Sequence, residues 1–87
     1  MSCTAARETL IRAVDLALAG DWEGAHAIAQ ADEQDAAACW LHAVLHKIEG
    51  DDWNSRYWYR RTAHVFDDFK DPQAELAAIR ASLAAQP

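Results

Sequence analysis

Two Gly-Asp dipeptides that lie thirty positions apart constrain the fold more than any other feature of this sequence. Each dipeptide separates two stretches whose apolar residues recur at helical spacing, so the unit is a helix, a Gly-Asp turn and a second helix. Shifting residues 6–30 onto 36–60 superposes apolar residues and both turns: Ala13 on Ala43, Val14 on Val44, Leu18 on Ile48 and Gly20-Asp21 on Gly50-Asp51. A helical unit repeated at this period predicts hairpins that bury their apolar faces against each other.

The composition favours helices along the whole chain. Of the 87 residues 20 are Ala, the best helix former, whereas only 3 are Gly and 2 are Pro, the main helix breakers. Caps and periodicity predict five helices, at about 4–19, 22–31, 36–49, 53–66 and 72–84, with a charged loop at 67–71. The expected N-caps are Asp21, Asp35, Asp52 and Asp71. We therefore expect a single all-α domain over 1–87, with pseudo-repeats at about 4–31 and 35–66 and a C-terminal helix at about 72–84.

The charge balance excludes some partners. There are 8 Lys and Arg against 14 Asp and Glu, so the formal net charge is −6, and nucleic-acid binding normally needs a clustered excess of basic residues. No apolar run approaches the roughly 20 residues of a membrane helix, and no basic segment followed by an apolar run begins the sequence. Cys3 and Cys39 form no C-x-x-C pair, so we expect both to be reduced. These features predict a soluble, cytoplasmic protein that binds neither nucleic acid nor membrane.

Both Gly-Asp turns are flanked by small and aromatic residues: the run Leu18-Ala19-Gly20-Asp21-Trp22-Glu23-Gly24-Ala25, then Trp40, Gly50-Asp51, Ser55 and Tyr59. Through these residues, the segment 6–63 resembles tetratricopeptide repeats. The resemblance implies an array of two helical hairpins, which the C-terminal helix would follow. Because such arrays usually need about three units, two hairpins predict either a compact closed bundle or a homodimer.

A second resemblance covers residues 40–61. The run Trp40-Leu41-His42, then His46, Glu49-Gly50-Asp51, Asn54 and Tyr57-Trp58-Tyr59-Arg60-Arg61 is similar to a motif of small uncharacterised microbial proteins. That family has no assigned activity, so this resemblance implies no function.

The helix expected at 36–49 carries potential metal ligands on one face. His42, His46 and Glu49 fall at i, i+4 and i+7, and Cys39 lies at i−3. Two His at this spacing can chelate zinc or a similar metal, and a carboxylate one turn further could be a third ligand or a general base; His64 could approach as a fourth group. The alternative, which we favour at this point, is that both His side chains pack against a neighbouring helix and that no cofactor is bound.

The helix expected at 53–66 is the densest aromatic segment. Trp53, Tyr57, Arg60 and His64 line one side at helical spacing, and a guanidinium beside an aromatic ring can stack on it while binding a carboxylate or phosphate. The alternative is that this side is also buried. The candidate binding residues are therefore His42, His46, Glu49, Tyr57, Arg60 and Arg61.

The sequence thus predicts a small helical-repeat module that binds a protein partner or a small anionic ligand and is not an enzyme. One alternative is a metal-dependent or general acid–base enzyme that uses His42, His46 and Glu49. A further alternative is a structural subunit of a larger assembly, in which the His face is an interface.

Overall fold

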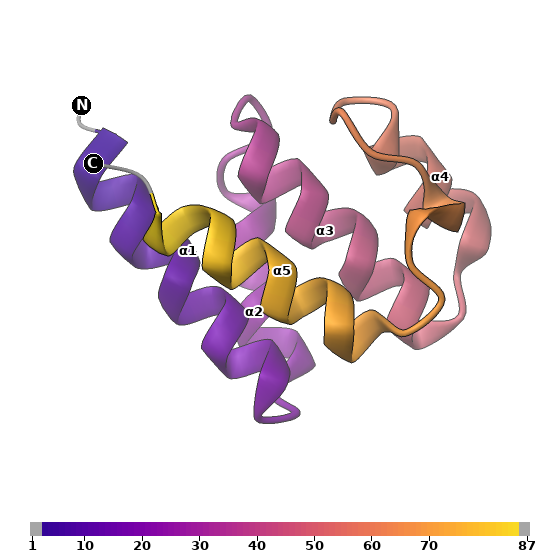
Figure 1. The fold of residues 1–87 in the computed structure, drawn as a ribbon, viewed down its shortest axis with the longest axis horizontal. Coiled ribbons are helices and arrows are strands. Elements are labelled where there is room, and N and C mark those ends of the chain that lie inside the picture. Colours follow the sequence, from indigo (N-terminus) through magenta and orange to yellow (C-terminus); the bar gives the residue numbers. More distant parts are fainter. Residues whose placement is uncertain (1–2, 86–87) are drawn as a thin grey trace.

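The computed structural model describes residues 3–85, and within them it is all-α, as predicted. Five α-helices and one short 3-10 helix follow each other along the chain (Figure 1): α1 (Cys3–Leu18), α2 (Trp22–Gln30), α3 (Ala36–Glu49), α4 (Asp52–Tyr59), η1 (Phe66–Asp68) and α5 (Pro72–Ala84). The prediction that Cys3 is reduced concerns a side chain that the structure does not describe. None of the helices in the described part of the chain is long and apolar enough to cross a membrane.

Aspartate caps and glycine turns set the helix boundaries. Asp21, Asp35 and Asp71 each accept a backbone N–H of the helix that follows, as predicted. The two Gly-Asp turns share one conformation, because Gly20 and Gly50 have φ angles of 92° and 87°. This left-handed geometry favours glycine and ends the preceding helix in both cases.

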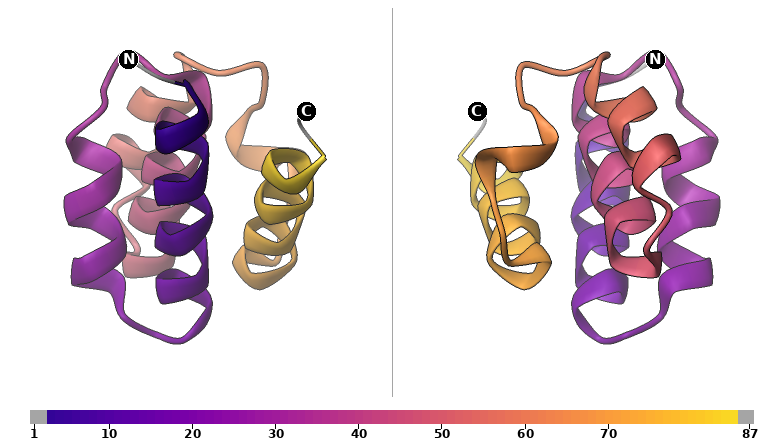
Figure 2. Two further views of the ribbon diagram at one scale, coloured as in Figure 1. Left: turned by 90° about the vertical axis from the view of Figure 1, so that its left-hand side faces the viewer. Right: turned by 90° about the vertical axis from the view of Figure 1, so that its right-hand side faces the viewer.

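Helix α3 is the centre of the molecule. It packs against α2, α4 and α5, and every residue from Ala38 to His46 is buried. Helix α5 crosses α1 and α3 (Figure 1), and Figure 2 shows it on one side of these two helices while α2 lies on the other. Leu76, Ile79 and Leu83 form the buried face of α5, as predicted.

A buried carboxylate joins α5 to α3 and α4. Glu75 is fully buried, and its side chain accepts hydrogen bonds from Trp40 Nε1 at 2.8 Å, Tyr59 OH at 2.7 Å and Lys47 Nζ at 2.8 Å. Lys47 also donates to the carbonyl oxygens of Phe66 and Phe69. A buried charge is tolerated when it is paired and its remaining hydrogen-bonding capacity is used, which is the case for this Lys–Glu pair.

The prediction for the fourth helix was wrong at both ends. Helix α4 begins at Asp52 with Asp51, not Asp52, as its N-cap, because the Asp51 side chain accepts the backbone N–H of Asn54. It ends at Tyr59 instead of Phe66. The hydroxyl of Thr62 donates to the carbonyl of Tyr59 and accepts from the N–H of His64, which replaces helical hydrogen bonds and turns the chain.

Candidate metal centre

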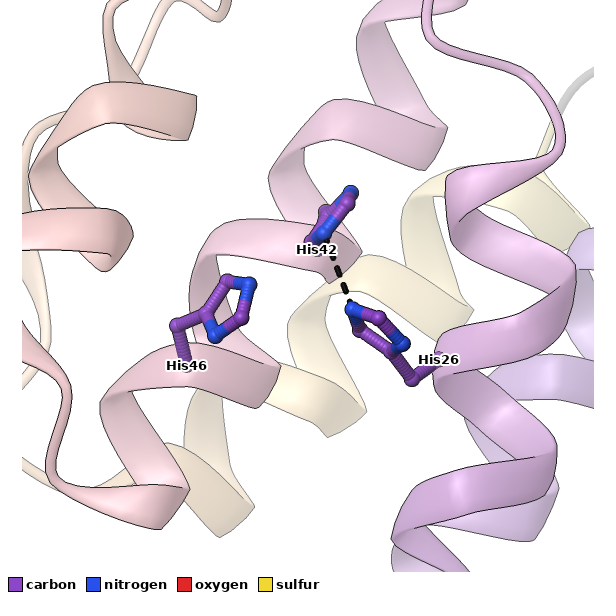
Figure 3. Close-up of side chains that lie close together, drawn as sticks. All are labelled: His26, His42 and His46. Atoms are coloured by element: carbon purple, nitrogen blue, oxygen red, sulfur yellow. Dashed lines mark hydrogen bonds between the residues drawn. The ribbon is translucent and has the colours of Figure 1, made fainter.

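Three histidines from two helices meet between α2 and α3. His42 and His46 lie one turn apart on α3, and His26 projects toward them from α2 (Figure 3). Each ring offers one nitrogen, and these three atoms all lie within 4.8 Å of one another. His42 and His46 are buried and His26 is half-buried, so the cluster lies at the edge of the core.

His26 and His42 lie closest together. Their Nε2 atoms are 3.1 Å apart, which in neutral rings means that one nitrogen donates to the other. Two nitrogens bound to one tetrahedral zinc at 2.0–2.1 Å are about 3.3 to 3.4 Å apart. The pair therefore already has nearly the spacing that two ligands of one metal ion require.

A carboxylate orients the third ring. His46 Nδ1 lies 2.6 Å from Glu49 Oε2, and because an ionised carboxylate only accepts, the ring nitrogen donates. In the neutral ring this arrangement places the proton on Nδ1 and leaves the Nε2 lone pair available. The same carboxylate–histidine arrangement orients and strengthens metal-ligating histidines in general.

Two tryptophans hold the other two rings. Trp22 stacks on His26 with ring centroids 4.6 Å apart, and Trp58 stacks on His42 at 4.0 Å. The indole N–H of Trp22 donates to the carbonyl of Leu45 at 2.6 Å, which ties this ring to α3. The stacking restricts ring rotation, so the imidazoles are positioned before any ligand binds.

Burial favours the neutral form of two of the three rings, those of His26 and His42. Desolvation lowers the pKa of His42 to about 4, helped by the proximity of His26 and His46, and desolvation also lowers the pKa of His26. Neutral imidazole is the form that binds metals. At pH 7 His26 and His42 therefore do not need to lose a proton to become ligands.

One atom of the cluster opposes metal binding. His42 Nδ1 is buried and has no hydrogen-bond partner among the described residues. When Nε2 of this ring carries the proton, Nδ1 has only a lone pair and needs no partner. When Nε2 binds a metal, the proton must move to Nδ1, which then becomes a buried N–H without an acceptor. Such an unpaired buried donor costs about 1–3 kcal/mol, which offsets part of the gain from the other two rings.

The structure brings together three of the six predicted site residues. His42, His46 and Glu49 form the centre together with His26, whereas Tyr57 and Arg61 lie beyond Trp58, whose ring is 5.1 Å from the Arg61 guanidinium. Arg60 lies elsewhere, in a pocket beside η1.

The other two metal candidates lie apart from the cluster. The thiol S–H of Cys39 donates to the carbonyl oxygen of Glu33, and burial raises the pKa of this thiol. His64 stacks on Trp40 with ring centroids 3.7 Å apart, on the opposite side of α3. The prediction that His64 lies on the fourth helix was wrong, because that helix ends at Tyr59.

The sequence interpretation missed His26. The Trp22–His26 spacing of i, i+4 places both rings on one face of α2, and that was the available signal. The pairing of α2 with α3 decides that this face meets His42 and His46.

Comparisons of the chain with protein-family models, with curated proteins and with solved structures find no match. The geometry of the described residues is therefore the basis for assigning a function.

Proposed function

We propose that this protein binds a divalent transition metal ion through His26, His42 and His46. The observation that carries the proposal is the convergence of three imidazole nitrogens from two helices within 4.8 Å. Imidazole ligands suit zinc, copper, nickel and iron, whereas calcium and magnesium prefer oxygen. The ligand set therefore selects a first-row transition metal, with zinc as the reference ion for tests.

The ion would join the two halves of the molecule. His26 belongs to the first hairpin, and His42 and His46 belong to the second. A metal that binds the folded chain and not the unfolded one stabilises the fold by mass action, by about 2.7 kcal/mol when its free concentration is 100 times its Kd. Three protein ligands leave a fourth position of a tetrahedral ion for water or another exchangeable ligand.

Titration calorimetry on chelator-treated protein without an affinity tag tests the proposal. We expect one Zn²⁺ per chain and a higher melting temperature when zinc is added. His26→Gln should abolish both effects while the protein stays folded by circular dichroism. His64→Gln is the matched control, because it removes a histidine that lies outside the cluster, and it should bind zinc like the wild type.

Zinc binding by His26→Gln at wild-type affinity, or no stoichiometric binding by the wild type, would contradict the proposal. Co²⁺ provides an independent readout, since its visible absorption reports the coordination geometry directly.

A further inference from the structure

A second cluster of chemistry-bearing side chains lies beside η1, away from the histidine centre. It surrounds a pocket of about 240 Å³ lined by Arg56, Tyr59, Arg60, His64, Val65 and Phe66. The lining thus combines the side chains of two arginines and a histidine with aromatic and aliphatic side chains. The volume is below the roughly 300–1,000 Å³ typical for drug-sized ligands, so the pocket suits a smaller molecule.

Arg60 is the free cation of this pocket. It follows the last residue of α4 and is exposed, and its side chain forms no hydrogen bond or ion pair within the described part of the chain. The arginines at positions 61 and 80 differ: Arg61 lies over the Tyr57 and Trp58 rings, and Arg80 is paired with Asp15 at 2.6 Å. An unpaired guanidinium beside a pocket offers all its N–H groups to a ligand.

Arg56 adds a second guanidinium that is already positioned. It lies on α4, four residues before Arg60, with its guanidinium 4.2 Å from the centroid of the Phe66 ring. Its nearest acid, Asp67, is 4.0 Å away, and both side chains are exposed. Such a surface ion pair contributes little, so an incoming anion can replace Asp67 as the partner of Arg56.

The other basic side chains near the pocket have acidic partners. His64 Nδ1 lies 3.6 Å from Asp68 Oδ2, and the same Asp68 oxygen accepts the backbone N–H of Val65. Lys47 lies 4.8 Å from the Phe66 ring centroid, but Glu75 neutralises it. Arg56 and Arg60 thus place two guanidinium groups on one side of the pocket, and the carboxylates of Asp67 and Asp68 lie beside it.

We infer that this pocket binds a small phosphate monoester, whose phosphate contacts Arg60 and Arg56 and whose apolar part lies against Phe66 and Val65. Guanidinium groups bind phosphate through paired, charge-assisted hydrogen bonds. A phosphate monoester carries about −1.5 to −2 charges at pH 7, which matches two arginines better than the single charge of a carboxylate does. The site shares no ligand residue with the histidine centre, so it does not depend on metal binding.

NMR titration of the metal-free protein with phenyl phosphate, inorganic phosphate and benzoate tests this inference. We expect phenyl phosphate to shift amide signals around the pocket and to bind more tightly than the other two probes. Arg60→Gln should weaken phenyl phosphate binding about tenfold or more. Arg61→Gln is the matched control, since it removes the same charge from the adjacent residue, and its affinity should stay within about twofold of the wild type.

Three outcomes would overturn the inference. The first is no saturable shift with phenyl phosphate. The second is an equal loss of affinity in the Arg60→Gln and Arg61→Gln variants, which would indicate a general charge effect instead of a pocket. The third is benzoate binding as tightly as phenyl phosphate, which would remove the case for a dianion.

Discussion

His46 donates its Nδ1 hydrogen to Glu49 over 2.6 Å, one helical turn further along α3. Because the carboxylate orients the ring, it would act on an ion bound at the proposed centre through His46, without contacting that ion. Partners of this kind contribute about 10- to 100-fold to metal affinity. We therefore expect Glu49→Gln to weaken zinc binding by at least about tenfold in calorimetry, without changing the stoichiometry. Glu23→Gln, an exposed change on α2, is the control, and equal affinities in the two variants would contradict a positioning role for Glu49.

Acid should destabilise the fold through His42. The folded-state pKa is about 4, below the ordinary value of 6.5, so the unfolded chain binds the proton more readily. The stability that neutral His42 contributes is fully present above pH 6.5. It is lost as the pH falls from 6.5 to about 4, by up to about 3 kcal/mol. Urea unfolding of metal-free protein between pH 4 and 8 measures this dependence. His42→Phe, which keeps a ring against Trp58, should flatten it, and a wild-type slope in that variant would assign the effect to other groups.

Removing the buried carboxylate should be among the most damaging single changes. Glu75→Ala deprives Lys47, whose side chain is 7% exposed, of its acid and leaves Trp40 and Tyr59 without their acceptor. Breaking a buried ion pair in this way costs about 3–5 kcal/mol. The free energy of unfolding in urea provides the measurement. A loss below about 1 kcal/mol would show that water replaces the carboxylate.

Because helices pack closely around Ala25, we expect this position not to tolerate a larger side chain. Ala25 on α2 is 0% exposed, whereas Ala27 on the same helix is exposed. We expect Ala25→Leu to cost about 1–3 kcal/mol by overpacking and Ala27→Leu to be nearly neutral. Thermal unfolding of the two variants, which have the same composition, separates packing from helix propensity. Equal melting temperatures would contradict close approach at Ala25.

Much of the fold could be predicted because its signals are local. Helices α3 and α5 begin and end where caps, glycine and proline predict, and both Gly-Asp turns lie where the repeated pattern places them. The end of α4 could not be predicted in this way. Aromatic spacing continues to Phe66, but the Thr62 hydroxyl and the Lys47 ammonium, which bonds the carbonyls of Phe66 and Phe69, hold the segment in another path.

The sequence brings together part of the histidine cluster, although its favoured interpretation was packing of both rings without a bound metal. His42, His46 and Glu49 share a face of one helix, so their spacing alone indicates a cluster. His26 comes from another helix, and the sequence does not specify which face of α2 meets α3. Contact between α2 and α3, a tertiary property, places His26 beside His42 and His46. Cys39 and His64 lie apart from the cluster because they contact Glu33 and Trp40 instead.

Glu75 follows its buried partner Lys47 by 28 residues in the chain, and this separation affects when the core can close. During synthesis Lys47 leaves the ribosome well before Glu75, so for that interval the nascent chain holds a cation whose buried acid partner does not yet exist. Helices α3 and α4 cannot enclose Lys47 in this state without a large desolvation cost. The core around Lys47 can therefore close only once Glu75 is present, so the segment 72–84 is an integral part of that core.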